Sequence, residues 1–247
     1  MKSAGRTPAF GSRTPAFGSR TPVSGGRIPA VTLPPEPRLR IDLPAAKPLS
    51  PSFYARDTVT VARDLLGTVM IHETPEGPAA GRIVETEAYL RDDAACHASR
   101  GMTPRTKVMF GPPGRAYIYL IYGMYHCFNV ITAPRGIGEA VLIRALEPLT
   151  GLPLMASRRG KAAPRDLCSG PGKLVMALGI AMSQNGADLR RGPLRILPAA
   201  SAPWEGAGPS GRVPSRNIKV TTRVGITLDA HLPLRFYLEG NPFISRK

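Results

Sequence analysis

Cysteine is scarce in this chain of 247 residues, which has only Cys96, Cys127 and Cys168. The three are widely separated, odd in number, and form neither a CxxC pair nor a cluster with histidine at the spacing of metal ligands. Because a cysteine-ligated iron–sulfur cluster needs four thiolates close together, the chain cannot hold one by itself. This usage predicts free thiols in a reducing compartment such as the cytoplasm.

Long apolar runs and acidic residues are also missing. No stretch of about 18 apolar residues occurs, so no transmembrane helix is predicted and the protein is expected to be soluble. Asp and Glu number 17 against 33 Lys and Arg, which gives a net charge of +16. Such an excess attracts polyanions, so nucleic acid is the first partner to test. A solvated basic surface on a protein with another task is the alternative.

The first fifty residues differ in composition from the rest. They contain RTPAFGS at 6–12, the same sequence at 13–19, and the degraded copy RTPVSGG at 20–26. The proline and glycine in each copy exclude a coiled coil and argue against the amphipathic helix of a transit peptide. We predict that residues 1–50 form a disordered basic tail of charge +6, and that 51–247 form a folded domain carrying the other +10.

Hydrophobic periodicity and turn residues predict the first elements of the folded part. A helix is predicted over TVTVARDLLG, residues 58–67, with Asp57 or Thr58 as its N-cap. A hairpin over residues 67–90 should turn at TPEGP, and a second hairpin should turn at Gly123.

The later elements complete the predicted fold. AVLIRALEP, residues 140–148, indicates a buried strand, and SGPGKLVMALGI, residues 169–180, indicates a helix capped by Ser169. Short apolar runs between Pro/Gly turns indicate further strands over residues 186–247. Since the strands mostly neighbour one another, the prediction is a single α+β domain with a curved, mostly antiparallel sheet surrounded by helices.

Two carboxylates lie close together in RIVETEAYL, residues 82–90. Strand alternation would place Glu85 and Glu87 on one face with Ile83 and Tyr89. Acids beside such residues indicate either an exposed edge strand or a functional cleft in which one carboxylate acts as a base. Spacing alone does not choose between the two interpretations or between the two acids.

A histidine and a basic loop follow this strand. His97 could be structural or could lie near the same strand end as Glu87. TPRTKVMFGPPG, residues 103–114, contains Arg105 and Lys107 beside hydroxyls and a Pro/Gly loop. Such a segment could contact phosphates or could be an ordinary basic loop.

Four of the seven tyrosines fall within YIYLIYGMYHCFN, residues 117–129. Tyr122 lies at the predicted turn beside Gly123, where its ring can project away from the sheet. A projecting ring is costly in water without a partner, and insertion between base pairs would supply one. The alternative is a tyrosine-rich core whose hydroxyls bond to the backbone.

Several motifs together resemble those of a known enzyme family. In order along the chain they are RIVETEAYL, the histidine at 97, TPR, MFGPPG, YIYLIYGMYHCFNV, VLIRALEPL, LCSGPGKL and PLRFYL. This order is similar to the alkyladenine (3-methyladenine) DNA glycosylase family over about residues 53–243. The resemblance implies an enzyme that flips a damaged purine, such as 3-methyladenine, 7-methylguanine or hypoxanthine, out of duplex DNA. Water then hydrolyses the bond between base and sugar and leaves an abasic site.

The resemblance also implies the general properties of the enzyme. It implies a monofunctional glycosylase that uses water rather than a lysine nucleophile and needs no metal or organic cofactor. Its partner would be double-stranded DNA with damaged purines, bound by a monomer at the nucleoid or, in a eukaryote, in the nucleus.

Individual roles are carried over by position. Glu87 would be the general base, while Arg144 and the backbone of Val224 would hold the attacking water or the adjacent backbone. The resemblance implies that Tyr89, His97 and Tyr119 form the walls of the base pocket and that Asn129 excludes guanine's 2-amino group. It implies that Tyr122 fills the gap left in the duplex. Phosphate contacts are implied near Arg105, Lys107 and Lys173.

Two other classes of protein are alternatives. A non-catalytic damaged-DNA-binding protein would keep the wedge and lack turnover, but the intact Glu87, Arg144 and RVG sequence argue against it. An RNA-binding protein could stack bases on the tyrosines, and a preference for lesion-containing duplex DNA over RNA would exclude it.

Overall fold

The computed structural model describes residues 47–121, 123–161, 163–202 and 212–246. The predicted tail therefore lies outside the described residues except for its last four positions. Among these, the backbone N–H of Leu49 donates to the carbonyl of Ile196 at 2.9 Å, and the Leu49 side chain packs against the core.

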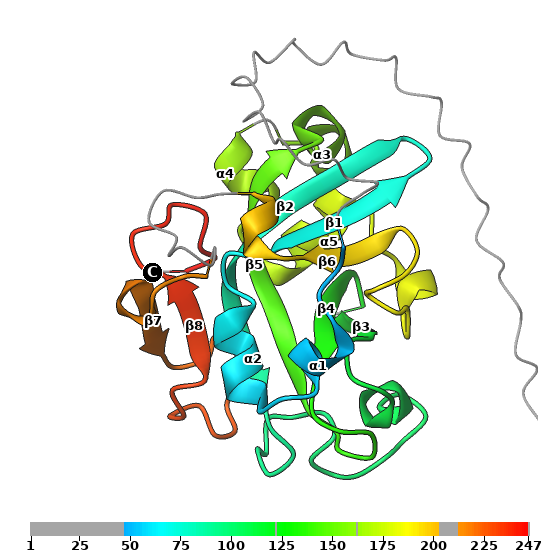
Figure 1. The fold of residues 1–247 in the computed structure, drawn as a ribbon, viewed down its shortest axis with the longest axis vertical. Coiled ribbons are helices and arrows are strands. Elements are labelled where there is room, and N and C mark those ends of the chain that lie inside the picture. The colour runs from blue at the N-terminus through cyan, green and yellow to red at the C-terminus, as the bar shows by residue number, and fades with distance from the viewer. Residues whose placement is uncertain (1–46, 122, 162, 203–211, 247) are drawn as a thin grey trace, which may run out of the picture. The chain divides into compact units, whose positions relative to one another are not determined.

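An open antiparallel sheet is the centre of the fold (Figure 1). Its strands are β1 (Val69–Thr74), β2 (Gly77–Tyr89), β3 (Ala116–Ile121), β4 (Tyr125–Ile131), β5 (Ala140–Thr150), β6 (Leu194–Leu197), β7 (Ile218–Thr221) and β8 (Arg235–Leu238). The order is β3-β4-β5-β2-β1-β6, with β8 beside the second half of β2 and β7 beside β8. The predicted α+β fold is confirmed, and β2 is a central strand with partners on both sides.

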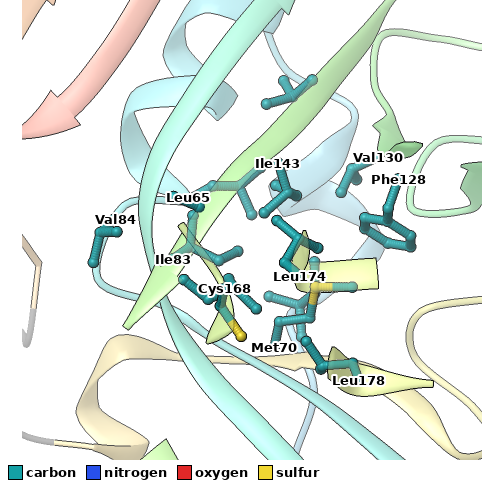
Figure 2. Close-up of a cluster of buried hydrophobic side chains, with 14 of the residues drawn as sticks. Leu65, Met70, Ile83, Val84, Phe128, Val130, Ile143, Cys168, Leu174 and Leu178 are labelled. Carbon is teal, nitrogen blue, oxygen red and sulfur yellow. The ribbon is translucent and has the colours of Figure 1, made fainter. Parts of the chain in front are cut away.

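Short helices cover this sheet. They are the α-helices α1 (Pro51–Tyr54), α2 (Thr58–Asp64), α3 (Leu152–Arg159), α4 (Pro164–Leu167) and α5 (Pro171–Leu178), with the 3-10 turns η1 (Lys107–Phe110), η2 (Met182–Gln184), η3 (Ala199–Ser201) and η4 (Ser215–Asn217). Helix α2 packs on β2 and β5, and α5 packs on β4 and β5. Figure 2 shows the cluster beneath them, in which Leu65 and Leu174 meet Ile143 of the sheet. Burying each such side chain stabilises the fold by about 1.5–3 kcal/mol.

Both predicted hairpins are confirmed, and the predicted helix forms but ends at Asp64 rather than at Gly67. Asp57 is the N-cap of α2, since its carboxylate accepts from the backbone N–H of Thr60 at 2.7 Å. β1 and β2 are joined by a tight turn at Pro75 and Glu76, within the predicted TPEGP. β3 and β4 pair around Gly123, whose φ of 68° suits a glycine at a turn.

The predicted cap of α5 is wrong by one residue. Gly170, rather than Ser169, occupies the N-cap position, and no side chain caps this end. Pro171 begins the helix, and its missing N–H removes one donor that a cap would have to satisfy. The hydroxyl of Ser169 instead accepts from Nζ of Lys173 at 3.3 Å.

The pairing of β2 with β5 shifts register twice at the position that matters for function. The shifts fall between Ile83 and Glu85 and between Glu85 and Thr86, so the predicted strict alternation is interrupted. At these two shifts, Val84 of β2 and Arg144 of β5 are left without a direct partner in this ladder. Because β-bulges redirect side chains, the second shift aims Arg144 at the acids of β2.

Candidate active site

Glu87 is the centre of a group of hydrogen-bond donors and is fully buried. Its Oε1 accepts from the backbone N–H of Val224 at 2.8 Å and lies 3.2 Å from Nη1 of Arg144. Its Oε2 accepts from the hydroxyl of Tyr89 at 2.9 Å. Three segments far apart in sequence, β2, β5 and the loop after β7, thus hold one carboxylate in one orientation.

The environment of Glu87 balances two opposing effects. Burial is the largest and raises the pKa of the Glu87 carboxyl above its ordinary value. The Arg144 charge, the Val224 N–H and the Tyr89 hydroxyl each oppose that rise by stabilising the carboxylate. A carboxylate poised in this way can accept a proton from a water molecule.

The second acid, Glu85, is also fully buried but has different partners. It accepts from Nε of Arg144 at 3.1 Å, Nε of Arg235 at 2.7 Å, and the hydroxyl and N–H of Ser245 at 2.9 and 2.5 Å. The prediction that the two acids lie side by side is confirmed, because Arg144 contacts both. The alternative of an exposed edge strand is wrong, because β2 is paired on both sides.

Next to Glu87 and Tyr89, a cavity of about 210 Å³ opens among aromatic side chains. Its lining includes Tyr89, His97, Arg105, Tyr117, Tyr119 and Asn129. The rings of His97 and Tyr119 meet edge to face with centroids 4.5 Å apart. The structure therefore brings together the four residues predicted to bind the base, namely Tyr89, His97, Tyr119 and Asn129.

His97 is held in a neutral form within this cavity. Its Nδ1 lies 3.0 Å from the hydroxyl of Tyr117. Burial, followed by the nearby charge of Arg105, lowers the pKa of His97 to about 4. Tyr117, for which sequence analysis predicted no role in the site, thus supports the histidine from the buried face of β3.

The predicted DNA contacts are spread over several elements. Arg105 is exposed and its guanidinium carbon lies 5.3 Å from the centre of the Tyr119 ring, at the cavity. Lys107 is exposed in the first position of η1, and Lys173 is half-buried in the first turn of α5. Tyr122, the predicted wedge, lies outside the described residues. The roles of these four residues stay predictions.

A buried ion pair that was not predicted from the sequence supports the site. Arg223 Nη2 donates to Asp93 Oδ1 at 2.9 Å, its Nη1 also bonds the carboxylate, and both side chains are fully shielded from solvent. The Arg223 guanidinium lies over the Tyr89 ring at 4.7 Å and donates to the carbonyl of Ala88 at 3.1 Å. Since Arg223 directly precedes Val224, this pair anchors the backbone N–H that contacts Glu87.

A larger cleft lies elsewhere and has a different character. It has a volume of about 680 Å³ and lies between the β1–β2 turn, the start of β4 and α5. Its acids Glu73 and Glu76 form ion pairs with Arg195 and Arg158. The larger cleft is not the candidate active site. Of the two, only the smaller cavity is lined by Tyr89, whose hydroxyl contacts Glu87.

The described part of the chain has neither a metal-binding cluster nor a membrane-spanning helix. Within residues 47–121, 123–161, 163–202 and 212–246, no group of three or more His, Cys, Asp or Glu is arranged to hold a metal ion. The helices of these same ranges include none with the length and apolar character to cross a membrane.

A buried carboxylate held by a backbone N–H beside an aromatic cavity, in a strongly basic protein, suits a hydrolase that acts on a nucleic-acid base. The family described as Methylpurine-DNA glycosylase (MPG) matches residues 52–242, and the chain belongs to this family. It is therefore a DNA glycosylase of base-excision repair, and DNA is its substrate.

Similar proteins cover most of the chain. A protein of Methanoculleus marisnigri named "Putative 3-methyladenine DNA glycosylase" is 55% identical over 199 residues, which are 81% of this chain and 99% of that protein. A protein with the same name from Carboxydothermus hydrogenoformans is 47% identical over 195 residues, 79% of this chain and 97% of that protein. The family predicted from the sequence is thus confirmed.

Proposed function

We propose that this enzyme flips a damaged purine nucleotide out of duplex DNA and hydrolyses its N-glycosidic bond with a water that Glu87 activates. The observation that carries the proposal is the buried Glu87 carboxylate, held by Val224, Arg144 and Tyr89 beside a cavity of about 210 Å³. Alkylated purines such as 3-methyladenine and 7-methylguanine are the proposed substrates, and hypoxanthine is the neutral lesion to test. The names of the similar proteins support 3-methyladenine as a substrate.

The proposed chemistry follows from how the bond breaks. The sugar becomes cation-like in the transition state, so the negative charge of Glu87 stabilises it while the carboxylate takes a proton from water. Val224 and Arg144 both contact Oε1, and Tyr89 contacts Oε2, so the carboxylate cannot rotate away. The free base leaves, and the abasic site remains in an uncut strand.

The cavity walls suit a flat, electron-poor base. Stacking on an aromatic side chain contributes roughly 1–3 kcal/mol per base, and a positively charged alkylated base gains a cation–π attraction. A neutral His97 avoids the repulsion that an imidazolium would exert on such a base. We assign Asn129 to exclusion of guanine's 2-amino group.

DNA contacts outside the cavity complete the proposal. Tyr122 would fill the gap left by the extruded nucleotide, and Arg105, Lys107 and Lys173 would contact phosphates. We propose that the enzyme acts as a monomer, on chromosomal DNA in the cytoplasm.

Release of free base is the direct test. The purified enzyme is incubated with methylated DNA and with a hypoxanthine-containing duplex, and the released bases are separated and identified. Release of 3-methyladenine and 7-methylguanine with strands left intact is expected. Binding of damaged DNA without base release would instead indicate a non-catalytic damage-binding protein, and trapping of a covalent DNA adduct by borohydride would contradict the proposed use of water.

Base release should slow at acid pH because of Glu87. The folded state raises the pKa of this carboxyl above its ordinary value of 4.5, and only the ionised form accepts a proton. The rate should therefore fall as the pH drops through that raised pKa, which lies higher than for a free glutamate. The measurement is the pH–rate profile for 7-methylguanine, because a neutral base would need additional proton transfer.

A variant of His97 tests which of the two residues causes the fall in rate at acid pH, which is the acid limb of the pH–rate profile. His97, with a pKa of about 4, stays neutral above that pH and should contribute no acid limb there. His97→Gln should therefore weaken base binding but leave the acid limb in place. Disappearance of the limb in His97→Gln would assign the titration to the histidine and contradict the prediction for Glu87.

We also propose that residues 1–50 are a basic tail that adds nonspecific DNA affinity, and that residues 51–247 carry the catalysis. Since Leu49 bonds to Ile196, the deletion should end at residue 46. Deletion of 1–46 should weaken DNA binding at low salt, and the difference from the full chain should shrink as the salt concentration rises. The rate of base release should not change.

Binding curves at several salt concentrations test this proposal. The matched control keeps the length of the tail and replaces its arginines by glutamine, namely Arg6, Arg13, Arg20, Arg27, Arg38 and Arg40. The replacement and the deletion should have similar effects if charge is the cause. Unchanged low-salt affinity in the deletion would contradict the proposal.

A further inference from the structure

A second buried group lies behind Glu87, centred on Glu85. Glu85 is fully buried and accepts hydrogen bonds from Arg144, Arg235 and Ser245 at 2.5 to 3.1 Å. With Glu87 included, two carboxylates face two guanidinium groups, so the charges of the group balance. A balanced, fully bonded group of this kind fixes the geometry of each member.

Arg144 connects this group to the candidate base. Its Nε donates to Glu85 at 3.1 Å, its Nη1 lies 3.2 Å from Glu87, and its Nη2 donates to the hydroxyl of Ser245 at 3.3 Å. All three nitrogens of the Arg144 guanidinium are therefore held by side chains. The position of Nη1 against Glu87 depends on what holds the other two nitrogens.

The segment that follows β8 supplies part of this support. Ile244 is buried in the main hydrophobic cluster, which places Ser245 beside Glu85. The carbonyl of Arg246 accepts from Nη2 of Arg235, whose Nε also bonds Glu85. The segment therefore contacts Glu85 and Arg235 through its backbone and through the Ser245 hydroxyl.

We infer that Glu85, Arg235 and Ser245 are positioning residues for base release, because they fix the Arg144 guanidinium against Glu87. None of the three contacts the aromatic cavity, so their effect on the reaction passes through Arg144. This inference rests on the proposed function, in which Glu87 is the base.

Ser245→Ala is the most informative variant because it keeps the charges of the group. It removes the hydroxyl that donates to Glu85 and accepts from Arg144. Small misplacements of catalytic groups can cost up to about 100-fold in rate, so we expect about a tenfold lower kcat with DNA affinity unchanged. A loosened Arg144 would stabilise the Glu87 carboxylate less, so the acid limb of the pH–rate profile should move to higher pH.

Three further variants accompany Ser245→Ala in single-turnover base release from methylated DNA. Ser245→Thr keeps a hydroxyl and should restore most of the rate. Glu85→Gln removes the negative charge that pairs with Arg144 and Arg235 and should lower kcat further, while leaving measurable turnover. Glu147→Gln is the matched control, since Glu147 pairs with Arg82 across the same two strands at 3.1 Å but lies outside the site. It should retain the wild-type kcat.

Thermal unfolding of each variant is recorded so that rates are compared on folded protein. The inference is overturned if folded Ser245→Ala and Glu85→Gln keep the wild-type kcat and acid limb. It is also overturned if Ser245→Thr does not restore the rate, or if Glu147→Gln loses as much, because either result indicates general destabilisation. Failure of the proposed function is distinguishable, because the wild-type enzyme would then release no base.

Discussion

Glu87→Gln should abolish base release while leaving DNA binding intact. An amide cannot take a proton from water, and loss of a general base costs about 100- to 10,000-fold in rate. Loss of the negative charge beside a cation-like sugar adds to this, so a fall of at least about 1000-fold, or about 4 kcal/mol in the activation barrier, is expected. Glutamine has the same shape and its oxygen can still accept from Val224, so the cavity should keep its form. Single-turnover release from methylated DNA and a binding titration measure the two effects.

Glu85→Gln is the control variant that shows which of the two acids is the general base. Both acids are fully buried on the same strand, and both contact Arg144. Glu85→Gln should keep measurable turnover because Glu85 contacts Arg144, Arg235 and Ser245 and not the cavity. If Glu85→Gln were the inactive variant and Glu87→Gln active, the assignment of the base would be wrong.

Local patterns account for the parts of the fold that could be predicted. The turns at TPEGP and Gly123 depend on residues within a few positions of each other, and both were located correctly. The cap at Asp57 was one of two neighbouring candidates, the other being Thr58. The cap of α5 was misplaced by one residue because Ser169 and Gly170 are both suitable caps, and only the helix start at Pro171 decides between them.

The arrangement of the site depended on contacts that are distant in sequence. Alternation placed the two acids together but could not distinguish them, because Glu85 differs from Glu87 in its bonds to Arg235 and Ser245, which are 150 and 160 positions away. The register shifts that aim Arg144 arise from pairing between β2 and β5, which no single segment encodes. Resemblance to a family selected Glu87, and the structure adds that Glu85 has a full set of donors of its own.

The buried pair of Arg223 and Asp93 is another contact that local sequence patterns could not predict. Its loss should have large effects on stability and on base release. The two residues are 130 positions apart, and neither side chain is reached by solvent. Arg223 also stacks on Tyr89 and directly precedes Val224. The Tyr89 hydroxyl and the Val224 N–H, which both contact Glu87, therefore depend on the position of Arg223. Removal of one charge from a buried pair leaves the other without compensation.

Asp93→Asn should therefore lower the free energy of unfolding by about 3–5 kcal/mol. Urea denaturation measures this change, provided that the slope with denaturant stays constant. Base release should also slow on the remaining folded enzyme, because the Val224 N–H loses its anchor. Asp64→Asn is the matched control, since Asp64 also pairs with arginine, but its partners Arg56 and Arg212 are 34% and 59% exposed. Its loss should be no more than about 1 kcal/mol, and equal losses in the two variants would show that burial is not what makes the Asp93 pair important.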